Sequence, residues 1–525
     1  MTKRPLGAQI SHMLKDRGVD TIFGIPGVHN VEMYRGIEEA GITHVLARHE
    51  QGAGFMADGY ARAAGRPGVA YVITGPGVCN IMTPMGQAYS DSVPMLVISS
   101  CLDETAATRG QLHQMKDQRA AAETVCDWSE EARTAKAAYQ LIDRALLEFD
   151  VARPRPKHIQ VPIELLGTDA PDFPSGGEGD GRLHHADAIE GIVLPYLRQA
   201  KRPLVIFGAG AKTENARMMV EKIGAACFST YAARGIVGDD YPLDFGATLS
   251  YASSADVVAS ADLVIAIGTE LAAVDIQRNH LGHSCPMIRV DIDPECLFDQ
   301  QRAEVRVHAD AADFVDLVIE LSDDGAATDW TSDEVAAARA KWRAEADAAY
   351  PGIIPICDAL RDALPDDTMI YSDMTQIAYV AKEIWPMKYP GHWHHPYGFG
   401  TLGYALPAAI GGKIGVGDKP VAAIMGDYGF HYTMQELGVA VELGLNIPIV
   451  LWDNAKLKEI EDCMVQSQIA PNAVFARNPD FCKLAEAFGA KAAAPGSLAE
   501  LQDAVQAAFA ADGPTLIHVT PDILG

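Results

Sequence analysis

The stretch that decides the fold runs Ile424-Met425-Gly426-Asp427-Tyr428-Gly429-Phe430, then through a helical segment to Ile447-Pro448-Ile449-Val450-Leu451-Trp452-Asp453-Asn454. Each of its two apolar runs is followed by residues with oxygen-bearing side chains, Asp427 after Gly426 in the first and Asp453-Asn454 in the second. Two short buried strands around one helix predict a β-α-β unit, whose strand ends open at the same edge of a parallel sheet. Ligands bind at this edge in open α/β sheets.

The chemistry of these two strand ends suits a hard cation. A carboxylate from Asp427, an amide oxygen from Asn454 and nearby backbone carbonyls are ligands that Mg²⁺ accepts, usually together with phosphate oxygens. Gly429 would let the backbone approach a phosphate closely. A plain β-α-β unit with polar strand ends would explain a single Gly-Asp pair, but the second polar strand end favours a metal site.

This pattern resembles the thiamin diphosphate motif, in which Gly-Asp-Gly is followed after a fixed interval by Asn-Asn. The resemblance implies that Asp427, the Asn454 side chain and the Lys456 carbonyl hold Mg²⁺, which anchors the cofactor diphosphate. It also implies cofactor contacts from Gly426, Tyr428 and Gly429. Tyr428 stands where the motif has its third glycine and Asp453 where it has its first asparagine, and neither departure removes a metal ligand.

Length and composition indicate a large water-soluble protein. The 525 residues are enough for roughly three domains. A net charge of −28 argues against nucleic acid and anionic membranes as partners, because both bind basic patches. No apolar run is long enough to span a membrane, and no apolar signal core follows Met1–Leu6, so we expect a cytoplasmic protein. The nine cysteines contain no Cys-x-x-Cys pair, which favours free thiols.

Apolar strands alternate with helical segments along the whole chain, which predicts an α/β fold of three doubly wound parallel-sheet domains. We expect these domains at residues 1–166, 185–325 and 345–525, with a linker over 167–181 and a polar stretch over 322–333. Gly208-Ala209-Gly210 follows a strand but lacks the third glycine of a dinucleotide fingerprint, so a glycine turn is favoured. Whether the central domain binds FAD or another nucleotide stays open.

Three turns near the N-terminus each follow a predicted strand: Gly24–Gly27, Arg48–Glu50 and Thr74–Gly77. Together they resemble the pyrimidine-binding domain of thiamin diphosphate enzymes of the acetolactate synthase and 2-oxo acid decarboxylase family, and the order of the three domains matches too. The resemblance implies that Glu50 shares a proton with the cofactor's aminopyrimidine ring, which activates the thiazolium carbon C2. The implied cofactor contacts from this domain are Pro26, Gly27, Thr74 and Asn80.

In this family the cofactor is held by the C-terminal domain of a partner chain, so the resemblance implies a homo-oligomer, at least a dimer and by expectation a tetramer. The segment Gly398–Pro407, called the wedge segment below, resembles the family segment whose bulky residue folds the cofactor into a V. Leu402 occupies the place of that bulky residue. The same resemblance implies that Thr375 and Gln376 contact the diphosphate, and helix starts offer N–H groups that suit a phosphate.

Histidines are the remaining candidates for handling substrate or protons. A single histidine is more often structural, but His29 follows the first of the three N-terminal turns, and His113 lies in Leu112-His113-Gln114, where the family often has an active-site glutamine. Histidines that converge on one cleft from separate loops are expected to handle a substrate carboxylate or protons. We therefore predict catalytic roles for His29 and His113. The pair His394 and His395, which precedes the wedge segment, is a further substrate-binding candidate.

The expected reaction is non-oxidative decarboxylation of a small-molecule 2-oxo acid. The same residues would serve an acetolactate synthase-like carboligase or a thiamin-dependent C–C hydrolase. A non-catalytic binding protein is disfavoured because Glu50, Asp427 and Asn454 are intact.

After the metal motif comes Lys458-Glu459-Ile460-Glu461-Asp462. An acidic cluster of this kind is equally well a solvated helix face. Alternatively, Glu459 or Asp462 binds a cationic substrate tail, because a carboxylate pairs with a guanidinium through two parallel hydrogen bonds. The stretch Gly426–Phe430 with Tyr432-Thr433 looks like the family branch that decarboxylates 5-guanidino-2-oxopentanoate, so we expect a basic or polar 2-oxo acid rather than pyruvate.

Overall fold

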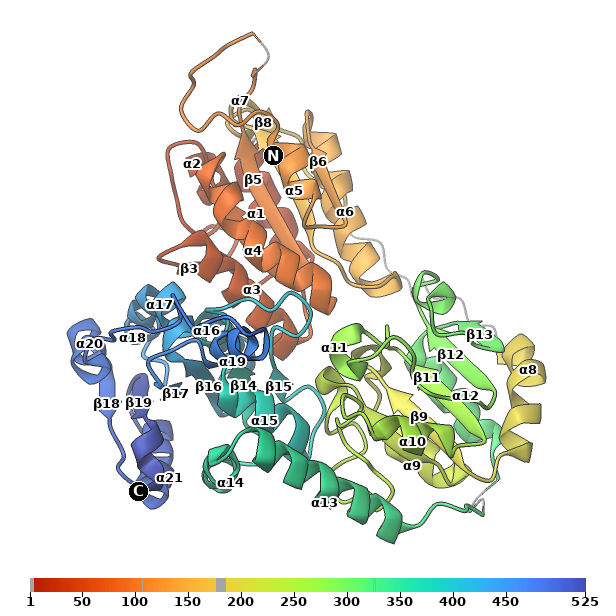
Figure 1. Ribbon diagram of the computed structural model, residues 1–525. Helices are drawn as coiled ribbons and strands as arrows, with labels where there is room; N and C mark the ends of the chain where they lie inside the picture. Colours follow the sequence, from red (N-terminus) through yellow and green to blue (C-terminus); the bar gives the residue numbers. More distant parts are fainter. Residues whose placement is uncertain (1–3, 106, 176–185, 324, 326) are drawn as a thin grey trace.

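The computed structural model describes residues 4–105, 107–175, 186–323, 325 and 327–525. They form three α/β domains, each built on its own parallel sheet, as the sequence predicts (Figure 1). Helix α13 (Ser332–Ala349) runs from the central domain to the third domain along the bottom of the view. All nine cysteines are free thiols.

The first domain contains a six-stranded sheet in the order β3-β2-β4-β5-β7-β6. Its strands are β2 (Thr21–Gly24), β3 (Thr43–Leu46), β4 (Gly68–Val72), β5 (Met95–Cys101), β6 (Trp128–Glu131) and β7 (Lys157–Pro162). Helices α1 (Leu6–Asp16) and α6 (Ala135–Val151) pack on one face of the sheet. Helices α3 (Glu50–Ala64) and α4 (Pro76–Asp91) pack on the other.

The central domain has the strand order β10-β9-β11-β12-β13. Its strands are β9 (Pro203–Phe207), β10 (Ala226–Ser229), β11 (Leu263–Ile267), β12 (Met287–Asp291) and β13 (Val305–His308). One face is covered by α8 (Ala186–Gln199), α9 (Ala216–Ile223) and α12 (Ala311–Leu321). The turn after β9 is a packing feature, because a Cβ on Gly208 would lie 2.0 Å from the Gly268 carbonyl oxygen.

The third domain has the strand order β15-β14-β16-β17-β19-β18. Its strands are β14 (Met369–Ser372), β15 (Trp393–His394), β16 (Val421–Gly426), β17 (Pro448–Trp452), β18 (Lys491–Ala493) and β19 (Thr515–Val519). One face carries α14 (Ile353–Ala363), α15 (Gln376–Ile384) and α21 (Leu498–Phe509). The other carries α16 (Ala405–Val416), α17 (Asp427–Thr433), α18 (Leu437–Glu442) and α20 (Phe481–Phe488).

The first and third domains share one hydrophobic core, in which α3 packs directly against α16. Glycines make this close approach possible. A Cβ on Gly59 would lie 2.0 Å from the Ala408 carbonyl oxygen, and one on Gly411 would lie 1.8 Å from that of Met56. Any larger side chain at either position would force the two helices, and with them the two domains, apart.

The predicted linker over 167–181 is only partly a free connection. Its first residues include β8 (Asp169–Ala170), which pairs antiparallel with β1 (Arg4–Pro5) and so is fixed to the first domain. Residues 176–181 of that prediction lie outside the described residues. The backbone N–H and C=O groups of an extended segment take partners where a neighbouring edge offers them, which composition alone does not reveal.

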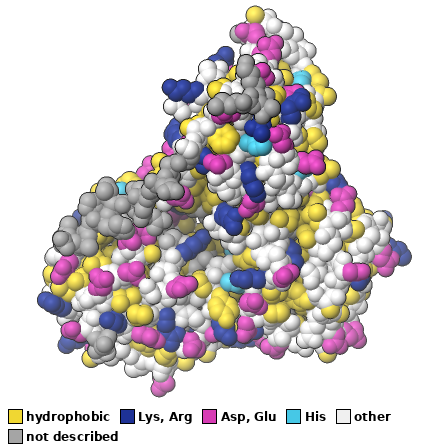
Figure 2. Space-filling model, turned by 180° about the vertical axis from the view of Figure 1, so that it is seen from behind, with side chains coloured by type: hydrophobic (Ala, Val, Ile, Leu, Met, Phe, Trp, Pro, Cys, Tyr) yellow, Lys and Arg dark blue, Asp and Glu magenta, His cyan; other side chains and the backbone are white. Residues whose placement is uncertain are grey.

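The described helices do not include one that is long and apolar enough to cross a membrane. On the face shown in Figure 2, acidic and basic side chains are interspersed rather than gathered into one basic patch.

Candidate cofactor site

Strands β14, β16 and β17 are neighbours in the third sheet, so their carboxyl ends form one continuous edge. Gly426 ends β16, and Asp427, which is 3% exposed, begins α17 directly after it. Burial raises the pKa of the Asp427 carboxyl. Asn454 follows β17 at the same edge, so the structure brings together the two strand ends that the sequence pairs.

The loop after β17 contains the predicted ligands Asn454 and Lys456. Ala455, which lies between them, has a positive φ of 56°, an uncommon conformation for a residue with a Cβ. A neighbouring segment fixes the loop, since the Leu457 N–H donates to the Val474 carbonyl at 2.8 Å. The Asn454 amide nitrogen donates to Gln376 Oε1 at 2.9 Å, which orients that amide.

These residues fit a magnesium diphosphate. The donor set of one carboxylate, one amide oxygen and one carbonyl consists of the hard oxygens that Mg²⁺ prefers, and phosphate oxygens and water would complete its octahedron. Helix α15, whose N-cap is Thr375, begins beside this edge, and α17 begins within it. Helix N-termini are suitable for a phosphate because their N–H groups are unpaired. Tyr428 lies in the first turn of α17.

Asp373, at the end of β14, organises the neighbouring loops. It is fully buried, and burial raises the pKa of its carboxyl to about 6. Its Oδ2 accepts a hydrogen bond from the Gly403 N–H at 2.8 Å. A Cβ on Gly429 would lie 2.5 Å from this same oxygen. Position 429 therefore has to be glycine because the Asp373 carboxylate lies so close to it. The sequence motif indicates a glycine near the phosphate but does not show this contact.

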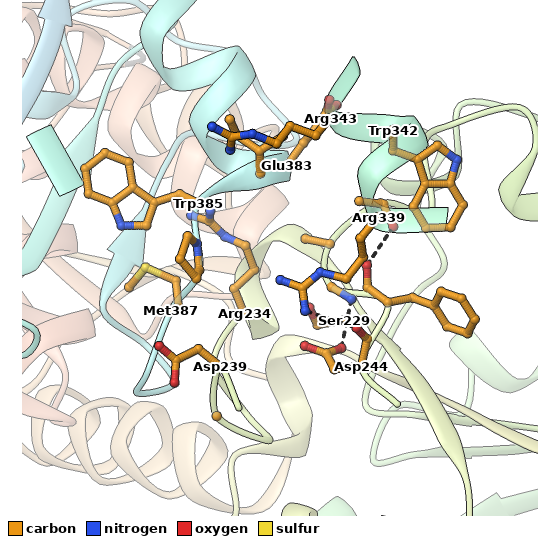
Figure 3. A pocket seen from close by; sticks show the side chains of 18 of the residues that line it. Ser229, Arg234, Asp239, Asp244, Arg339, Trp342, Arg343, Glu383, Trp385 and Met387 are labelled. Carbon is orange, nitrogen blue, oxygen red and sulfur yellow. Dashed lines mark hydrogen bonds between the residues drawn. The ribbon is translucent and has the colours of Figure 1, made fainter. Parts of the chain in front are cut away.

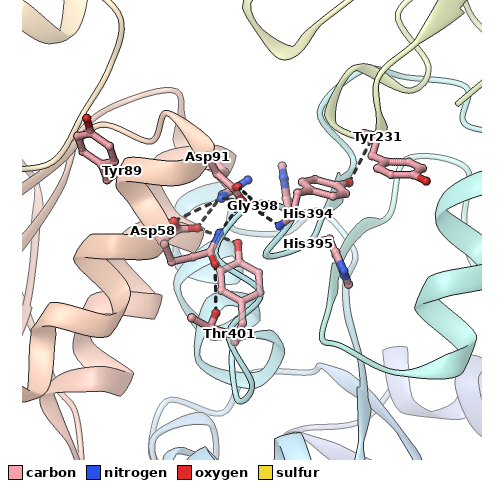
Figure 4. Close-up of polar contacts among 12 residues, drawn as sticks. Asp58, Tyr89, Asp91, Tyr231, His394, His395, Gly398 and Thr401 are labelled. Carbon is pink, nitrogen blue, oxygen red and sulfur yellow. Dashed lines mark hydrogen bonds and ion pairs between the residues drawn. The ribbon is translucent and has the colours of Figure 1, made fainter. Parts of the chain in front are cut away.

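The segment that carries Leu402 is held by both the third and the first domain (Figure 4). Asp91 on α4 accepts hydrogen bonds from the N–H groups of Tyr397 and Gly398 at 3.3 and 3.1 Å. The Thr401 hydroxyl donates to Gln87 Oε1 at 3.2 Å. Leu402 itself is half-buried, which leaves part of its side chain open to a ligand.

Glu50 begins α3 at the carboxyl edge of the first sheet and is 9% exposed. The Asn80 amide donates to Glu50 Oε2 at 2.8 Å. The start of α3 is fixed from the third domain by Glu436, whose two carboxylate oxygens accept from the Arg48 N–H at 3.2 and 3.1 Å. Burial raises the pKa of Glu436 to about 7. Sequence analysis did not identify Glu436, because the partner of Arg48 is 388 residues away.

His29 and His113 lie together next to the turn after β4. They form an edge-to-face pair with ring centroids 4.9 Å apart, and the Nδ1 atoms of both rings are buried without a hydrogen-bond partner in the described part of the chain. Burial, and then the neighbouring His113, lowers the pKa of His29. A Cβ on Gly75 would lie 2.4 Å from the His113 carbonyl oxygen, so these histidines adjoin the turn that begins at Thr74.

Pro26 and Gly27 form the turn after β2. The Gly27 N–H donates to Asn30 Oδ1 at 2.6 Å, and a Cβ on Gly27 would lie 2.4 Å from the Ile73 side chain. This turn is therefore packed against the end of β4, beside the turn that contains Thr74.

His394 and His395 are buried at β15 inside the third domain, at 5% and 2% exposure. Burial lowers the pKa values of both well below the ordinary range. His395 Nδ1 shares a hydrogen bond with the Ser372 hydroxyl at 2.9 Å, and the ring of His394 lies 4.8 Å from that of Tyr371. His395 is therefore fixed by a hydrogen bond, whereas His394 Nε2 is buried without a hydrogen-bond partner among the described residues.

The acidic segment after the metal motif forms α19 (Lys458–Gln466). Asp462 is ion-paired with Lys458, and Glu461 lies 3.0 Å from the ammonium of Lys456. Glu459 differs from both, since its Oε1 is buried without a hydrogen-bond partner among the described residues.

A cavity of about 300 Å³ lies where the central domain, α13 and the end of α15 meet (Figure 3). Arg234, Arg339 and Trp385 are among its walls, and none of the predicted site residues is. The cofactor contacts that the sequence predicts therefore lie elsewhere, at the strand edges of the first and third domains.

Comparison with known proteins identifies the class. Family models for thiamine pyrophosphate enzymes match three stretches: the N-terminal TPP binding domain over residues 4–121, the central domain over 192–318 and the C-terminal TPP binding domain over 373–519. The chain belongs to the thiamine pyrophosphate enzyme family, as its motifs predict.

Individual relatives span almost the whole chain. A probable 2-ketoarginine decarboxylase of Pseudomonas aeruginosa is 42% identical over 98% of this chain and 93% of its own length. The large subunit of acetolactate synthase isozyme 2 of Escherichia coli is 28% identical over 99% of this chain and 96% of its own. The catalytic subunit of mitochondrial acetolactate synthase of Saccharomyces cerevisiae is 26% identical over 98% and 80%.

Proposed function

We propose that this protein is a thiamin diphosphate- and Mg²⁺-dependent lyase that decarboxylates 5-guanidino-2-oxopentanoate without oxidation. The observation that carries the substrate is Glu459, a half-buried residue whose Oε1 atom is buried without a hydrogen-bond partner in the described structure. The 42% identity to a probable 2-ketoarginine decarboxylase supports the same substrate.

The surroundings of Glu459 suit a guanidinium. Burial is the largest cause of the raised pKa values of Tyr350 and Tyr379, and the negative charge of Glu459 is the second. Both tyrosines therefore lie near this carboxylate. The two rings are 6.5 Å apart between centroids. A planar cation would find a carboxylate for paired hydrogen bonds and aromatic faces for cation–π contact in one place.

The cofactor, when bound, supplies a carbon that adds to the substrate carbonyl and accepts the electron pair released with CO₂. Asp427, Asn454 and the Lys456 carbonyl would hold its Mg²⁺ at the edge of the third sheet. Glu50 would hold the proton of the pyrimidine ring. Asn80 fixes Glu50 Oε2, so Oε1, which has no hydrogen bond within the described ranges, is the oxygen for that proton.

We propose that Glu50 acts on a cofactor bound by the third domain of a partner chain, in at least a dimer and by expectation a tetramer. His29 and His113 would move protons at the carbonyl oxygen of the substrate and at the departing product. The Nδ1 atoms of both rings have no hydrogen-bond partner in the described structure, and the two histidines adjoin the turn that begins at Thr74. Leu402 would support the cofactor from below. His395 and Asp462 have weaker claims to the substrate, since His395 is hydrogen-bonded to Ser372 and Asp462 is ion-paired with Lys458. His394 stays a candidate, because its Nε2 is buried without a hydrogen-bond partner in the described structure.

The test is a substrate panel with matched variants. The purified enzyme with thiamin diphosphate and Mg²⁺ receives 5-guanidino-2-oxopentanoate and pyruvate, and CO₂, aldehyde and acetolactate are measured. Glu459→Gln should lower kcat/KM for the guanidino substrate by about 10–100-fold, as expected for a lost charged hydrogen bond, and change that for pyruvate little. Asp462→Asn, on the same helix, is the control and should change both little.

Two results would count against this substrate. A wild-type preference for pyruvate with acetolactate as product would identify a carboligase instead. Equal losses of kcat/KM on both substrates in Glu459→Gln would show that Glu459 does not bind the guanidino group of the substrate.

A further inference from the structure

Asn478 lies in the segment between α19 and α20, away from every motif of the sequence, yet it contacts the proposed metal ligand. Its Nδ2 donates to Asp427 Oδ2 at 2.7 Å and to Asp453 Oδ1 at 2.7 Å. Its Oδ1 lies 3.1 Å from His431 Nε2. One amide therefore connects the ends of β16 and β17 and the helix α17.

The orientation of this amide follows from its partners. An amide oxygen turned toward the two carboxylates would face two acceptor oxygens, Asp427 Oδ2 and Asp453 Oδ1, and no donor, whereas the NH₂ group has one hydrogen for each of them. His431, with its Nε2 protonated, donates to the amide oxygen from the other side. The three contacts are mutually consistent only with the NH₂ group between Asp427 and Asp453.

Asp453 is itself held firmly. Its Oδ2 accepts from His518 Nε2 at 2.9 Å, and its Oδ1 accepts from the Ala455 N–H at 3.0 Å as well as from Asn478. Three donors on two oxygens suit a carboxylate better than an amide, which has only one acceptor oxygen. This arrangement gives a physical reason for the aspartate at 453, where the family motif has asparagine.

We infer that Asn478 is a positioning residue for Mg²⁺ binding, which holds Asp427 Oδ2 so that Oδ1 faces the metal. It also separates two carboxylates that would otherwise repel each other, so Asp427 does not have to reorganise when the cation arrives. The inference rests on the proposed role of Asp427 as a metal ligand.

The experiment measures metal affinity directly, with Mn²⁺ in place of Mg²⁺. Free Mn²⁺ is quantified by electron paramagnetic resonance in the presence of saturating thiamin diphosphate. Asn478→Ala should raise the Mn²⁺ dissociation constant about 10–100-fold, the range seen when groups that orient a metal ligand are removed. Asn472→Ala is the matched control. That amide is exposed in the same segment and contacts only the Ala470 carbonyl among the described residues, so the constant should stay within about 2-fold.

Turnover separates positioning from a general structural defect. At saturating Mg²⁺, kcat of Asn478→Ala should return to near the wild-type value, because the defect lies in metal capture. Should Asn478→Ala fail to fold, as judged by circular dichroism, His431→Ala tests the same arrangement from its outer side and should weaken Mn²⁺ binding in the same direction.

The outcomes are distinct. Wild-type Mn²⁺ affinity in a folded Asn478→Ala, with a large loss in Asp427→Ala, would overturn the role of Asn478 and leave the metal site standing. Wild-type affinity in Asp427→Ala would remove the metal site itself. A loss of kcat in Asn478→Ala that excess Mg²⁺ does not restore would also overturn the inference.

Discussion

Replacing Arg62 with methionine should loosen the contact between the first domain and the wedge segment. Arg62 lies on α3 between two buried carboxylates, with Nε 2.6 Å from Asp58 Oδ1 and Nη2 2.9 Å from Asp91 Oδ2. The Tyr404 hydroxyl donates to Asp58 at 2.7 Å, and Asp91 accepts from the Gly398 N–H. The cluster therefore joins α3 and α4 to the segment that carries Leu402 (Figure 4).

The size of the effect follows from what the substitution leaves behind. The side chains of Asp58 and Asp91 are 0% and 5% exposed, so two carboxylates would remain buried without their cation. Removing one partner of a buried ion pair costs about 3–5 kcal/mol. The same change at Arg66, whose pair with Asp20 is exposed on both sides, should cost about 0–1 kcal/mol.

The cost should depend on pH in a defined direction. Burial already raises the pKa of Asp91 in the native protein, and loss of the Arg62 charge would raise it further. A carboxyl with a raised native pKa binds its proton more tightly when folded, so it favours folding at low pH and loses that contribution as pH rises. The difference between Arg62→Met and wild type should therefore be largest at pH 8 and shrink toward pH 5.

Urea unfolding followed by tryptophan fluorescence at pH 8 and pH 5.5 measures this difference, with Arg66→Met as the control. Hydrogen exchange of the peptide 397–404 reports whether the wedge segment opens first. A loss below about 1 kcal/mol, or one that is the same at both pH values, would refute the reasoning about buried charge.

Three further predictions concern the cofactor site and the core. Asp427→Ala should abolish Mg²⁺-dependent binding of thiamin diphosphate, which calorimetry would contradict by showing wild-type affinity. Glu50→Gln should keep the fold and the cofactor but lose about 10²–10⁴-fold in turnover, and near-normal activity across the pH range would exclude it from proton transfer. Burial lowers the pKa of His158 to about 3. Because its pKa in the unfolded chain is about 6.5, His158 should contribute a loss of about 1.6 kcal/mol of stability between pH 6.5 and pH 5, so the stability difference between wild type and His158→Gln in urea titrations should change by that amount over this range.

The sequence by itself determined the three α/β domains and the strand ends where side chains gather. Apolar runs such as 421–425 and 448–452 are strands because both faces of a parallel sheet are buried, and this signal is local. The first apolar run of the stretch quoted above, which ends in Ile424-Met425, is the C-terminal part of β16 (Val421–Gly426). Gly-Asp and Asp-Asn lie directly after such runs, so their approach at one edge follows from the topology of a parallel sheet.

Only the tertiary structure decided which groups orient these residues. Asn478 reaches Asp427 from 51 residues away, Glu436 reaches the start of α3 from 388, and Asp91 reaches Gly398 from 307. Each is a single polar side chain with no periodic or motif signal in its own stretch of sequence. Hydrogen bonds act over about 3 Å, so the partner of each side chain depends on how the domains pack against one another. The order of residues along the chain does not reveal which distant groups come within that distance.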